Sequence, residues 1–450
     1  MSAPPTAGEL LARLERIPQA GWHVRARMVV GVATFFDAFD LLAIASALPV
    51  LAGRWHLAAP QIGAIISAAF IGQIAGAIFF GWFSEKFGRL AGLRWTVLIF
   101  SLASLACAAA TNADTLFAAR LIQGFGLGGE VPVAGAYISE IARADKRGKF
   151  FLLYEMLFGI GITCAGLMSI WIVPRFGWQA MFVIGALPAA VGIGLRRLLP
   201  ESPRWLIGKQ RLEEARAAIA TIEAHVIARG ITLPAPLRVP EPRQEQTRLL
   251  ELFSGPYLRR TLMIWSAWFC TYFIVYGETT WLPTIYRTIY HLDLHTALLL
   301  GTANGVASLT GDLLVAFMID IVGRRVWYAL AFLLGALPLI VLWRLGAPDP
   351  ITVFALSAVS YVFIGSNAVS LVLYTGELYP TRMRALAGSI ATVWARIAAS
   401  VSPVLVGWTI DGFNIAAVFA MFALVSILGA VLCGLAGTET RRRVLEDVSP

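Results

Sequence analysis

The chain contains few charged residues for its length. Asp, Glu, Lys and Arg make up 14% of its 450 residues, whereas 58% are hydrophobic. A soluble globular domain carries about 25% charged residues. This shortage argues against a soluble protein and favours one that crosses a membrane many times.

Cysteine and histidine are also scarce, with four and five copies. The cysteines lie in apolar runs without metal-ligand or CxxC spacing, so we interpret them as packing residues. No histidine falls in the middle of an apolar run. The sequence also offers no Ser/His/Asp set, metal cluster or phosphate-binding loop. We therefore expect neither an enzyme, nor a cofactor, nor a metal site.

Long apolar runs are the main feature that the sequence does contain. A membrane-spanning helix needs about 20 predominantly apolar residues. Twelve runs meet this length, at 28–52, 61–83, 93–111, 115–138, 151–173, 178–198, 262–285, 296–319, 326–345, 351–375, 385–407 and 412–435.

Lysine and arginine gather on alternate connections between these runs. If the N-terminus is cytoplasmic, 30 of the 36 basic residues fall in cytoplasmic tails and loops. Only Arg54, Arg175, Arg287 and Arg344 fall on the other side. This asymmetry predicts a multi-pass plasma membrane protein, in a bacterial inner membrane, with both termini in the cytoplasm. The net charge of +9 then reflects topology and not a nucleic-acid partner.

The pattern of spans repeats across a long polar interval. SEKFGR at 84–89 recurs as IDIVGRR at 319–325, and acid–arginine pairs recur at offsets of 235 and 237 residues. The repeat predicts an all-α polytopic membrane protein with two six-helix bundles related by a pseudo-two-fold axis. The expected parts are a cytoplasmic N-terminal segment at 1–27, bundles at 28–199 and 262–436, a cytoplasmic linker with surface helices at 200–261, and a cytoplasmic tail at 437–450.

Several short motifs resemble those of one transporter superfamily. GWFSEKFGR at 81–89 and RLIQGFGLGGE at 120–130 are similar to the motifs that major facilitators carry after span 2 and in span 4. PESPRWL at 200–206 is typical of their sugar-porter, organic-ion and metabolite–proton symporter branches, and GTETRR at 437–442 resembles part of the sugar-porter ending. FDAFD at 36–40 resembles the acidic first-span motif of aromatic-acid–proton symporters and niacin-type transporters. The chain is identified as a member of this superfamily, which implies transport by alternating access.

Two acids in the first span are candidates for proton coupling. Asp37 and Asp40 lie three residues apart and so share a helix face. Burial and mutual repulsion favour the protonated form, so either acid can take a proton from one side of the membrane and release it to the other. The shifted positions in the second half hold Tyr272 and Val275, which favours a proton or substrate role. The alternative is that one acid pairs with a basic residue to hold helices together.

Arg120 in the fourth span is the expected partner of these acids. An arginine does not lose its proton, so inside a membrane it needs a carboxylate such as Asp37 or Asp40. The resemblance implies a proton-coupling role for Arg120. The alternative is an ion pair that serves helix packing alone.

Further residues within the spans are candidate substrate contacts. The planar fork of Arg396 suits a carboxylate, unless Asp312 neutralises it. Aromatic rings near Glu278 can stack on a flat ring, although Tyr and Trp also form interfacial belts. Glu130 and Asn367 occupy equivalent positions in the two halves and either support the structure or line the substrate path. The full set is Tyr276, Glu278, Trp281, Arg396, Asn367 and Glu130.

Charged residues at the cytoplasmic ends of the spans are expected to form a gate. Ion pairs there would latch the bundles when the substrate path opens outward and break when it opens inward. Glu155 is expected to join them, and the alternative is that these charges only fix the topology. The gate residues are Glu85, Arg89, Glu140, Arg147, Asp320, Arg324, Glu377 and Arg384.

Together these features predict proton-coupled uptake of a small organic anion, with an aromatic or heteroaromatic carboxylate such as nicotinate or a benzoate favoured. A sugar or polyol carrier and an organic-cation carrier are alternatives within transport. A membrane ligand-binding protein that does not transport is an alternative outside it. The expected partners are the small-molecule substrate, protons and the lipid bilayer, and the protein is expected to act as a monomer.

Overall fold

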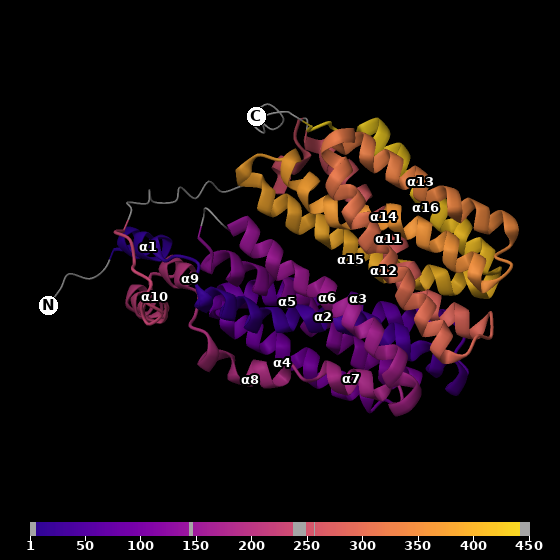
Figure 1. The fold of residues 1–450 in the computed structure, drawn as a ribbon, viewed down its shortest axis with the longest axis horizontal. Helices are drawn as coiled ribbons and strands as arrows, with labels where there is room; N and C mark the ends of the chain where they lie inside the picture. Colours follow the sequence, from indigo (N-terminus) through magenta and orange to yellow (C-terminus); the bar gives the residue numbers. More distant parts are fainter. Residues whose placement is uncertain (1–5, 144–146, 237–248, 256, 442–450) are drawn as a thin grey trace.

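The computed structural model describes residues 6–143, 147–236, 249–255 and 257–441. Within helices, the side chains of residues 147–149, 152, 381, 382 and 385 also lie outside the description. The described part of the chain consists of long helices joined by short connections (Figure 1).

Twelve helical elements correspond to the twelve predicted spans and confirm the predicted architecture. In the first half they are α2 (Gly21–Arg54), α3 (Ala59–Phe87), α4 (Arg89–Ala108), α5 (Ala113–Ile141), α6 (Arg147–Phe176), and α7 (Gln179–Gly185) continued by α8 (Ala189–Leu198). In the second half they are α11 (Tyr257–Thr288), α12 (Leu294–Val322), α13 (Arg324–Leu345), α14 (Pro350–Leu378), α15 (Thr381–Gly412) and α16 (Ile415–Ala436).

Ten of these elements qualify as membrane spans by length and hydropathy alone. The helices α5 and α11 are not among these ten. They carry Arg120, Glu130 and Glu278, so polar side chains lower their hydropathy. Charged groups inside a membrane are expensive and mark functional positions.

The elements alternate in direction and form two bundles, indigo to magenta and orange to yellow in Figure 1. We call the membrane face at which α3 and α5 end the basic face. The small helices α1 (Ala7–Arg16), α9 (Pro203–Gly208) and α10 (Leu212–Ile227) lie beside it. The other membrane face is the far face. The helix ends at the far face carry Arg54, Arg175, Arg287 and Arg344, as the charge distribution predicts.

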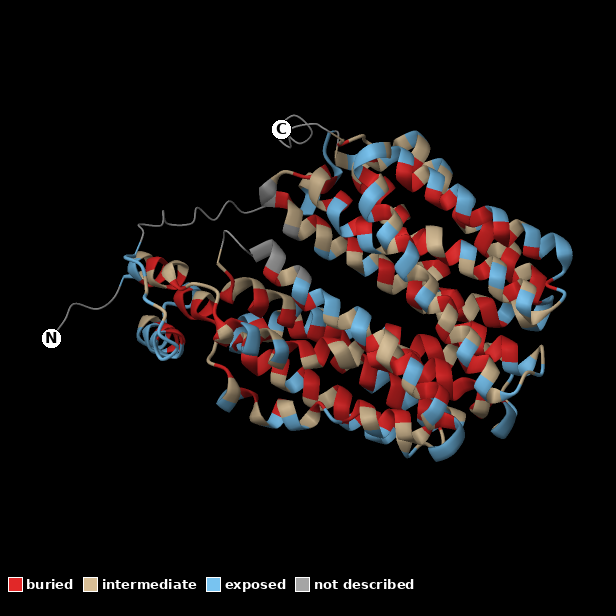
Figure 2. Ribbon diagram, in the orientation of Figure 1, coloured by how far each residue is buried: buried red, intermediate tan, exposed pale blue. Residues whose placement is uncertain are grey.

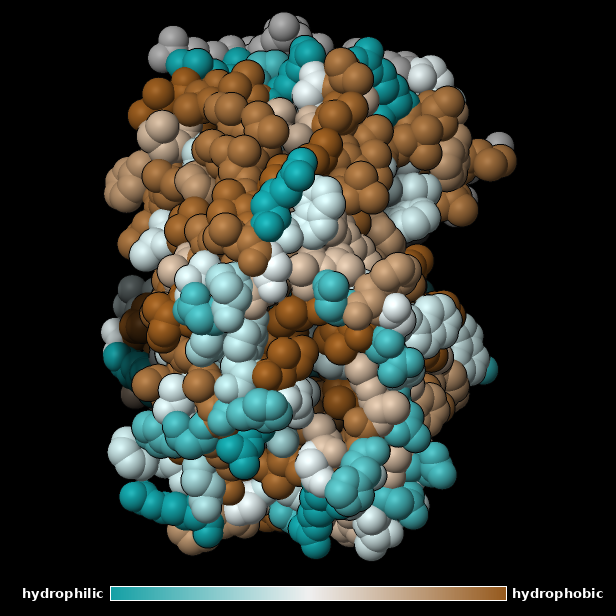
Figure 3. All heavy atoms as spheres, turned by 90° about the vertical axis from the view of Figure 1, so that its right-hand side faces the viewer, coloured by the Kyte–Doolittle hydropathy of each residue, from teal (hydrophilic) through white to brown (hydrophobic). Residues whose placement is uncertain are grey.

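The outer surface of the bundles is apolar. Large hydrophobic side chains stand exposed on the long helices, among them Ile78, Phe317 and Leu424. Figure 2 shows exposed positions along the outer flanks and buried ones where helices pack together. In Figure 3, hydrophobic side chains dominate the surface of the C-terminal bundle, in the upper half of the view. Such a surface suits contact with lipid, so the chain is a multi-pass membrane protein.

Glycines explain the close packing of α3 on α5. A Cβ added to Gly124 would lie 1.9 Å from the carbonyl oxygen of Ala69, and one added to Gly72 would lie 2.1 Å from that of Leu121. Neither helix could approach the other with a larger side chain at these positions. The glycine run in α5 therefore serves helix packing.

The repeat extends to the structure of two tight turns at the basic face. Gly88 and Gly323 adopt φ angles of +114° and +96°, which favour glycine. Glu201 accepts hydrogen bonds from the first two backbone N–H groups of α4, and Glu439 does the same for α13. A carboxylate at a helix N-terminus satisfies orphan donors and complements the helix dipole. The PESPRWL and GTETRR motifs are therefore equivalent capping devices of the two halves.

Three small helices cover the basic face of the N-terminal bundle: α1 (Ala7–Arg16), α9 (Pro203–Gly208) and α10 (Leu212–Ile227). The helices α9 and α10 lie in the segment 200–261, where the sequence predicts surface helices.

The N-terminal segment differs from the prediction, because α1 lies within it and α2 begins at Gly21. Polar residues interrupt the apolar pattern there, so no long apolar run marks α1 or the first turns of α2. The apolar face of α1, with Leu10 and Leu14, belongs to the same buried cluster as Ile222 of α10.

The two bundles meet in the half of the membrane next to the far face. A Cβ on Gly63 of α3 would lie 2.4 Å from the carbonyl oxygen of Pro403 in α15. Trp171 of α6 and His295 of α12 make an edge-to-face ring contact at 5.6 Å.

Candidate functional site

A buried ion pair joins α2 to α5. Nη1 of Arg120 lies 2.5 Å from Oδ2 of Asp40 and 2.8 Å from Oε1 of Gln123. Gln123 donates in turn to Oδ1 of Asp40 at 2.6 Å. Asp40 is 5% exposed and Arg120 2% exposed, so neither charge is screened by water. The pairing predicted for Arg120 is present, and it involves Asp40.

Asp37 has a different environment although it lies one helical turn away. It is half-buried. Its carboxyl group lies near enough to interact electrostatically, that is, within electrostatic reach, with Arg396 of α15, with Arg120, and with the acids Asp40 and Glu155. The two acids of the FDAFD motif therefore have different surroundings. Asp40 forms an ion pair within the N-terminal bundle, and Asp37 faces the second bundle.

Arg396 reaches across from the C-terminal bundle. Its Nη1 donates a long hydrogen bond of 3.4 Å to Oε1 of Gln73 in α3. The possibility that Asp312 neutralises Arg396 is not supported, because Oδ1 of Asp312 is buried without a hydrogen-bond partner among the described residues. Arg396 can therefore offer donors to an anion.

A row of aromatic rings runs along α11 beside these charges. The rings of Trp268 and Tyr272 stack at 5.4 Å, and those of Tyr272 and Tyr276 stack at 5.6 Å. Phe70 of α3 meets Tyr276 edge-to-face at 4.9 Å. Both tyrosines lie within electrostatic reach of Arg396. The sequence analysis selected Tyr276 among the aromatic residues near Glu278, which include Tyr272, and missed Trp268 and Phe70, although four-residue spacing along α11 signals the row.

Glu155 belongs to this constellation and not to the charges at the rim. It is exposed, and it lies within electrostatic reach of Asp37 and Tyr272. Arg89 pairs with Glu85 and Glu140 and not with Glu155, while the side chain of Arg147, the other expected partner, lies outside the described residues. We call Asp37, Glu155, Tyr272, Tyr276 and Arg396 the central site.

Glu130 lies in a separate polar cluster inside the N-terminal bundle. It is fully buried, and its Oε1 accepts a hydrogen bond of 2.8 Å from Thr34 of α2 and one of 3.4 Å from Tyr154 of α6. These bonds tie three helices together. They favour the structural interpretation of Glu130.

Three other candidates lie away from the central site. Trp281 is buried and donates to the carbonyl oxygen of Pro403 at 3.2 Å, beside a cavity of about 490 Å³ at the far face. Asn367 is fully buried in α14 with no hydrogen-bond partner for its side chain among the described residues. Glu278 is 1% exposed. The structure therefore does not bring these residues together with Asp37 and Arg396: Trp281 lies at the contact between the bundles near the far face, and Asn367 and Glu278 are buried.

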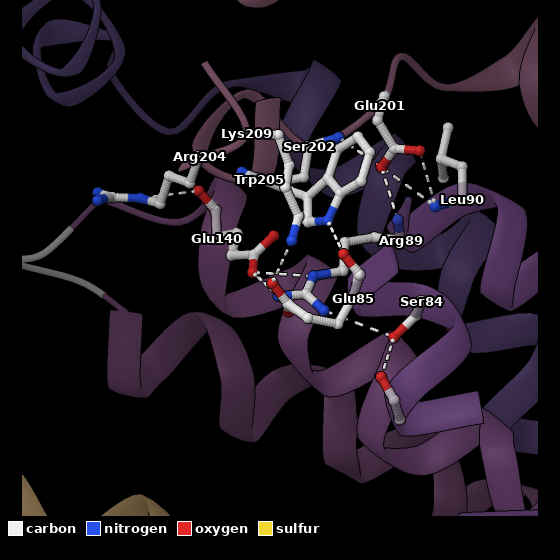
Figure 4. Close-up of polar contacts among 11 residues, drawn as sticks. Ser84, Glu85, Arg89, Leu90, Glu140, Glu201, Ser202, Arg204, Trp205 and Lys209 are labelled. Carbon is white, nitrogen blue, oxygen red and sulfur yellow. Dashed lines mark hydrogen bonds and ion pairs between the residues drawn. The ribbon is translucent and has the colours of Figure 1, made fainter. Parts of the chain in front are cut away.

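The charged residues at the basic face form one network in each bundle, and Figure 4 shows the network of the N-terminal bundle. In the N-terminal bundle, Arg89 pairs with Glu85 at 2.8 Å and with Glu140 at 2.9 Å. Figure 4 also shows Trp205 donating to the backbone carbonyl of Glu85, and Lys209 near its carboxylate. The PESPRWL segment thus holds the gate residues of its own bundle.

The C-terminal bundle repeats this arrangement. Arg324 pairs with Asp320 at 2.5 Å and with Glu377 at 2.9 Å, and Glu377 also accepts a hydrogen bond from Thr440. Arg384 donates to the backbone carbonyl of Tyr379 at 3.0 Å. The side chain of Arg147 lies outside the described residues. The described ion pairs thus join helices within a bundle, and the latch between bundles stays a prediction.

The chain resembles known transporters along its length. Residues 30–450 match the family described as Sugar (and other) transporter. The niacin transporter NiaP of Acinetobacter baylyi is 34% identical over 98% of this chain and 99% of its own length. The 4-hydroxybenzoate transporter PcaK of Pseudomonas aeruginosa is 33% identical over 60% of each chain. The crystal structure of a D-xylose–proton symporter shares the fold, with a TM-score of 0.72 and 19% identity over 94% of this chain and 100% of that chain.

Proposed function

Since this chain belongs to the sugar (and other) transporter family, we propose that it takes up a small aromatic or heteroaromatic carboxylate together with protons. Members of this family are transporters and not enzymes. The names of the similar proteins, a niacin transporter and a 4-hydroxybenzoate transporter, point to ring compounds that bear a carboxylate.

The observation that carries the proposal is the position of Arg396 beside the aromatic row of α11. The guanidinium offers paired N–H donors that match a carboxylate. Tyr272 and Tyr276 offer ring faces and edges at the same place, within electrostatic reach of that guanidinium. A flat ring bound among aromatic side chains gains contact area and about 0.5–1.5 kcal/mol per ring pair beyond burial.

Proton coupling follows from the acids at the central site. A substrate carboxylate that binds Arg396 comes near Asp37 and Glu155, which repel it while they are ionised. A proton on Asp37 removes its part of that repulsion, so the proton and the anion favour each other's binding. Asp40 serves a different purpose, because its ion pair with Arg120 holds α2 against α5.

The transport cycle uses both faces of the membrane. We assign the basic face to the cytoplasm by the positive-inside rule, which puts both termini there in a bacterial inner membrane. Substrate and proton enter from the far face, the bundles rock about the central site, and both leave at the basic face. One chain contains both bundles, so a monomer suffices.

The decisive experiment is uptake of labelled nicotinate and benzoate into proteoliposomes under an inward proton gradient. The parent should accumulate at least one of them, and Arg396→Gln should bind it roughly 10- to 100-fold more weakly, the value of one or two charge-assisted hydrogen bonds. The matched control is Arg344→Gln, which replaces an exposed arginine at the far face and should behave like the parent. A parent protein that accumulates neither acid at any pH would refute the proposal.

An organic-cation carrier is the second candidate, because Asp37 and Glu155 both act at the central site. A labelled amine in the same vesicles distinguishes the two functions. A cation carrier would accumulate the amine, and Arg396→Gln would not weaken its binding. The anion carrier should take up the carboxylate alone.

A further inference from the structure

Glu278 is a buried acid that the proposed transport cycle does not use. It lies in α11 and is 1% exposed, and neither of its carboxyl oxygens has a hydrogen-bond partner among the described residues. An isolated carboxylate in an apolar interior carries a large desolvation penalty. The protein therefore holds this group as the neutral acid, or supplies a partner at some point in the cycle.

The surroundings of Glu278 contain hydroxyl groups. Tyr286, two turns further along α11, and Tyr361 of α14 both lie within electrostatic reach of its carboxyl group. No charged side chain on the described parts of the neighbouring helices α2, α12, α14, α15 and α16 lies within such reach. A metal cluster of His, Cys, Asp or Glu side chains is also absent from the described residues. These surroundings can pass a proton but offer no fixed counter-charge.

Tyr361 interacts electrostatically with both Glu278 and the central site. Its hydroxyl lies 2.7 Å from the hydroxyl of Thr279 and within electrostatic reach of Glu278, Tyr272 and Asp312. Tyr272 belongs to the central site, and Tyr361 also acts on Tyr276. The hydroxyl of Tyr361 thus interacts electrostatically with the tyrosines near Arg396 and with the buried acid, although it makes no hydrogen bond to Glu278 in this structure.

We propose that Glu278 is a second proton-binding site, which exchanges protons with the central site through the hydroxyl of Tyr361. The carboxylate takes a proton to become the acid and later gives it back, while Tyr361 accepts a proton on its oxygen and passes on its own. This inference rests on the proposed function for its role in transport, and it adds one proton per substrate to the proton carried by Asp37.

A substrate-free experiment tests the site itself. Infrared difference spectra of the purified protein between low and high pH should show a carboxylic-acid band that converts to a carboxylate band. That pair should be missing in Glu278→Gln and present in Glu213→Gln, a control acid exposed on α10. If Glu278→Gln leaves every titrating band of the parent in place, the proposal is overturned. Because no substrate is needed, this result does not depend on the proposed function.

A second experiment tests the role in transport. The number of protons transported with each substrate molecule can be calculated from the membrane potential at which the net substrate flux reverses its direction. Glu278→Gln should lower that number by one and keep substrate exchange across vesicles at equal pH. An unchanged number would overturn the proposal.

Tyr361→Phe provides a variant in case Glu278→Gln does not fold, since it removes only one hydroxyl. It should slow the appearance of the carboxylate band after a pH jump. An unchanged rate would exclude the route through Tyr361.

Discussion

At the residue scale, Asp37 and Asp40 show how one turn of helix separates two tasks. Asp40 accepts hydrogen bonds from Arg120 and Gln123 inside the N-terminal bundle. Asp37 points to the interface and acts on Arg396. Their spacing predicts a shared helix face but not their partners, because the partners depend on the rotation of α2 against α5 and α15. The sequence therefore left open which acid pairs with Arg120.

The two acids should respond differently to substitution. Asp37→Asn should strongly lower accumulation driven by a proton gradient, because it removes the proton site of the central site, and leave exchange at equal pH intact, because it breaks no ion pair. Arg120→Ala should instead destabilise the protein by about 3–5 kcal/mol, because it leaves Asp40 buried and unpaired. Thermal unfolding in detergent and uptake assays measure both effects. Equal loss of stability in the two variants would contradict this division.

At the element scale, the length of an apolar run determines which helices can be predicted from the sequence. The spans follow from runs that only a membrane helix explains, and α10 follows from its helix-forming composition. The helix α1 escapes prediction because ten residues with mixed polarity resemble a polar tail. The aromatic row of α11 is visible as a spacing, but only the fold shows that it faces Arg396. The burial of Glu278 likewise depends on which face of α11 packs against α14, and the sequence does not show this.

The docking of α1 on α10 should depend on pH. Arg13 and Arg16 both donate to Glu223. Burial alone would raise the pKa of Glu223, but these hydrogen bonds outweigh it, so the pKa lies below its ordinary value. The contribution to stability is thus complete above about pH 4.3 and is lost as the pH falls further. A spin label at Gly8 should become mobile on acidification, and in Glu223→Gln it should be mobile throughout. A label whose mobility ignores pH would disprove this dependence.

At the scale of the whole molecule, two similar halves carry unequal chemistry. The glycine turns, the glutamate caps and the ion pairs at the basic face occur in both bundles. The ion pair of Asp40, by contrast, belongs to the first half, and Arg396 and Glu278 belong to the second. The repeat predicts the shared scaffold well. The central site depends on how the two bundles face each other, which no periodicity within one bundle encodes.

Movement of the bundles requires the close contact at the far face to form and break. Gly63 permits this contact, because a side chain there would meet the backbone of Pro403 at 2.4 Å. Gly63→Leu should therefore prevent the bundles from closing at the far face, so that substrate still binds in detergent but exchange across vesicles is lost. Gly159→Leu, an exposed position with no neighbour within 4 Å, should keep both activities. Equilibrium binding and vesicle exchange, measured on the same preparations, separate the two steps. If Gly63→Leu exchanges substrate as fast as the parent, closure at this contact is not part of the cycle, and the rocking motion must pivot elsewhere.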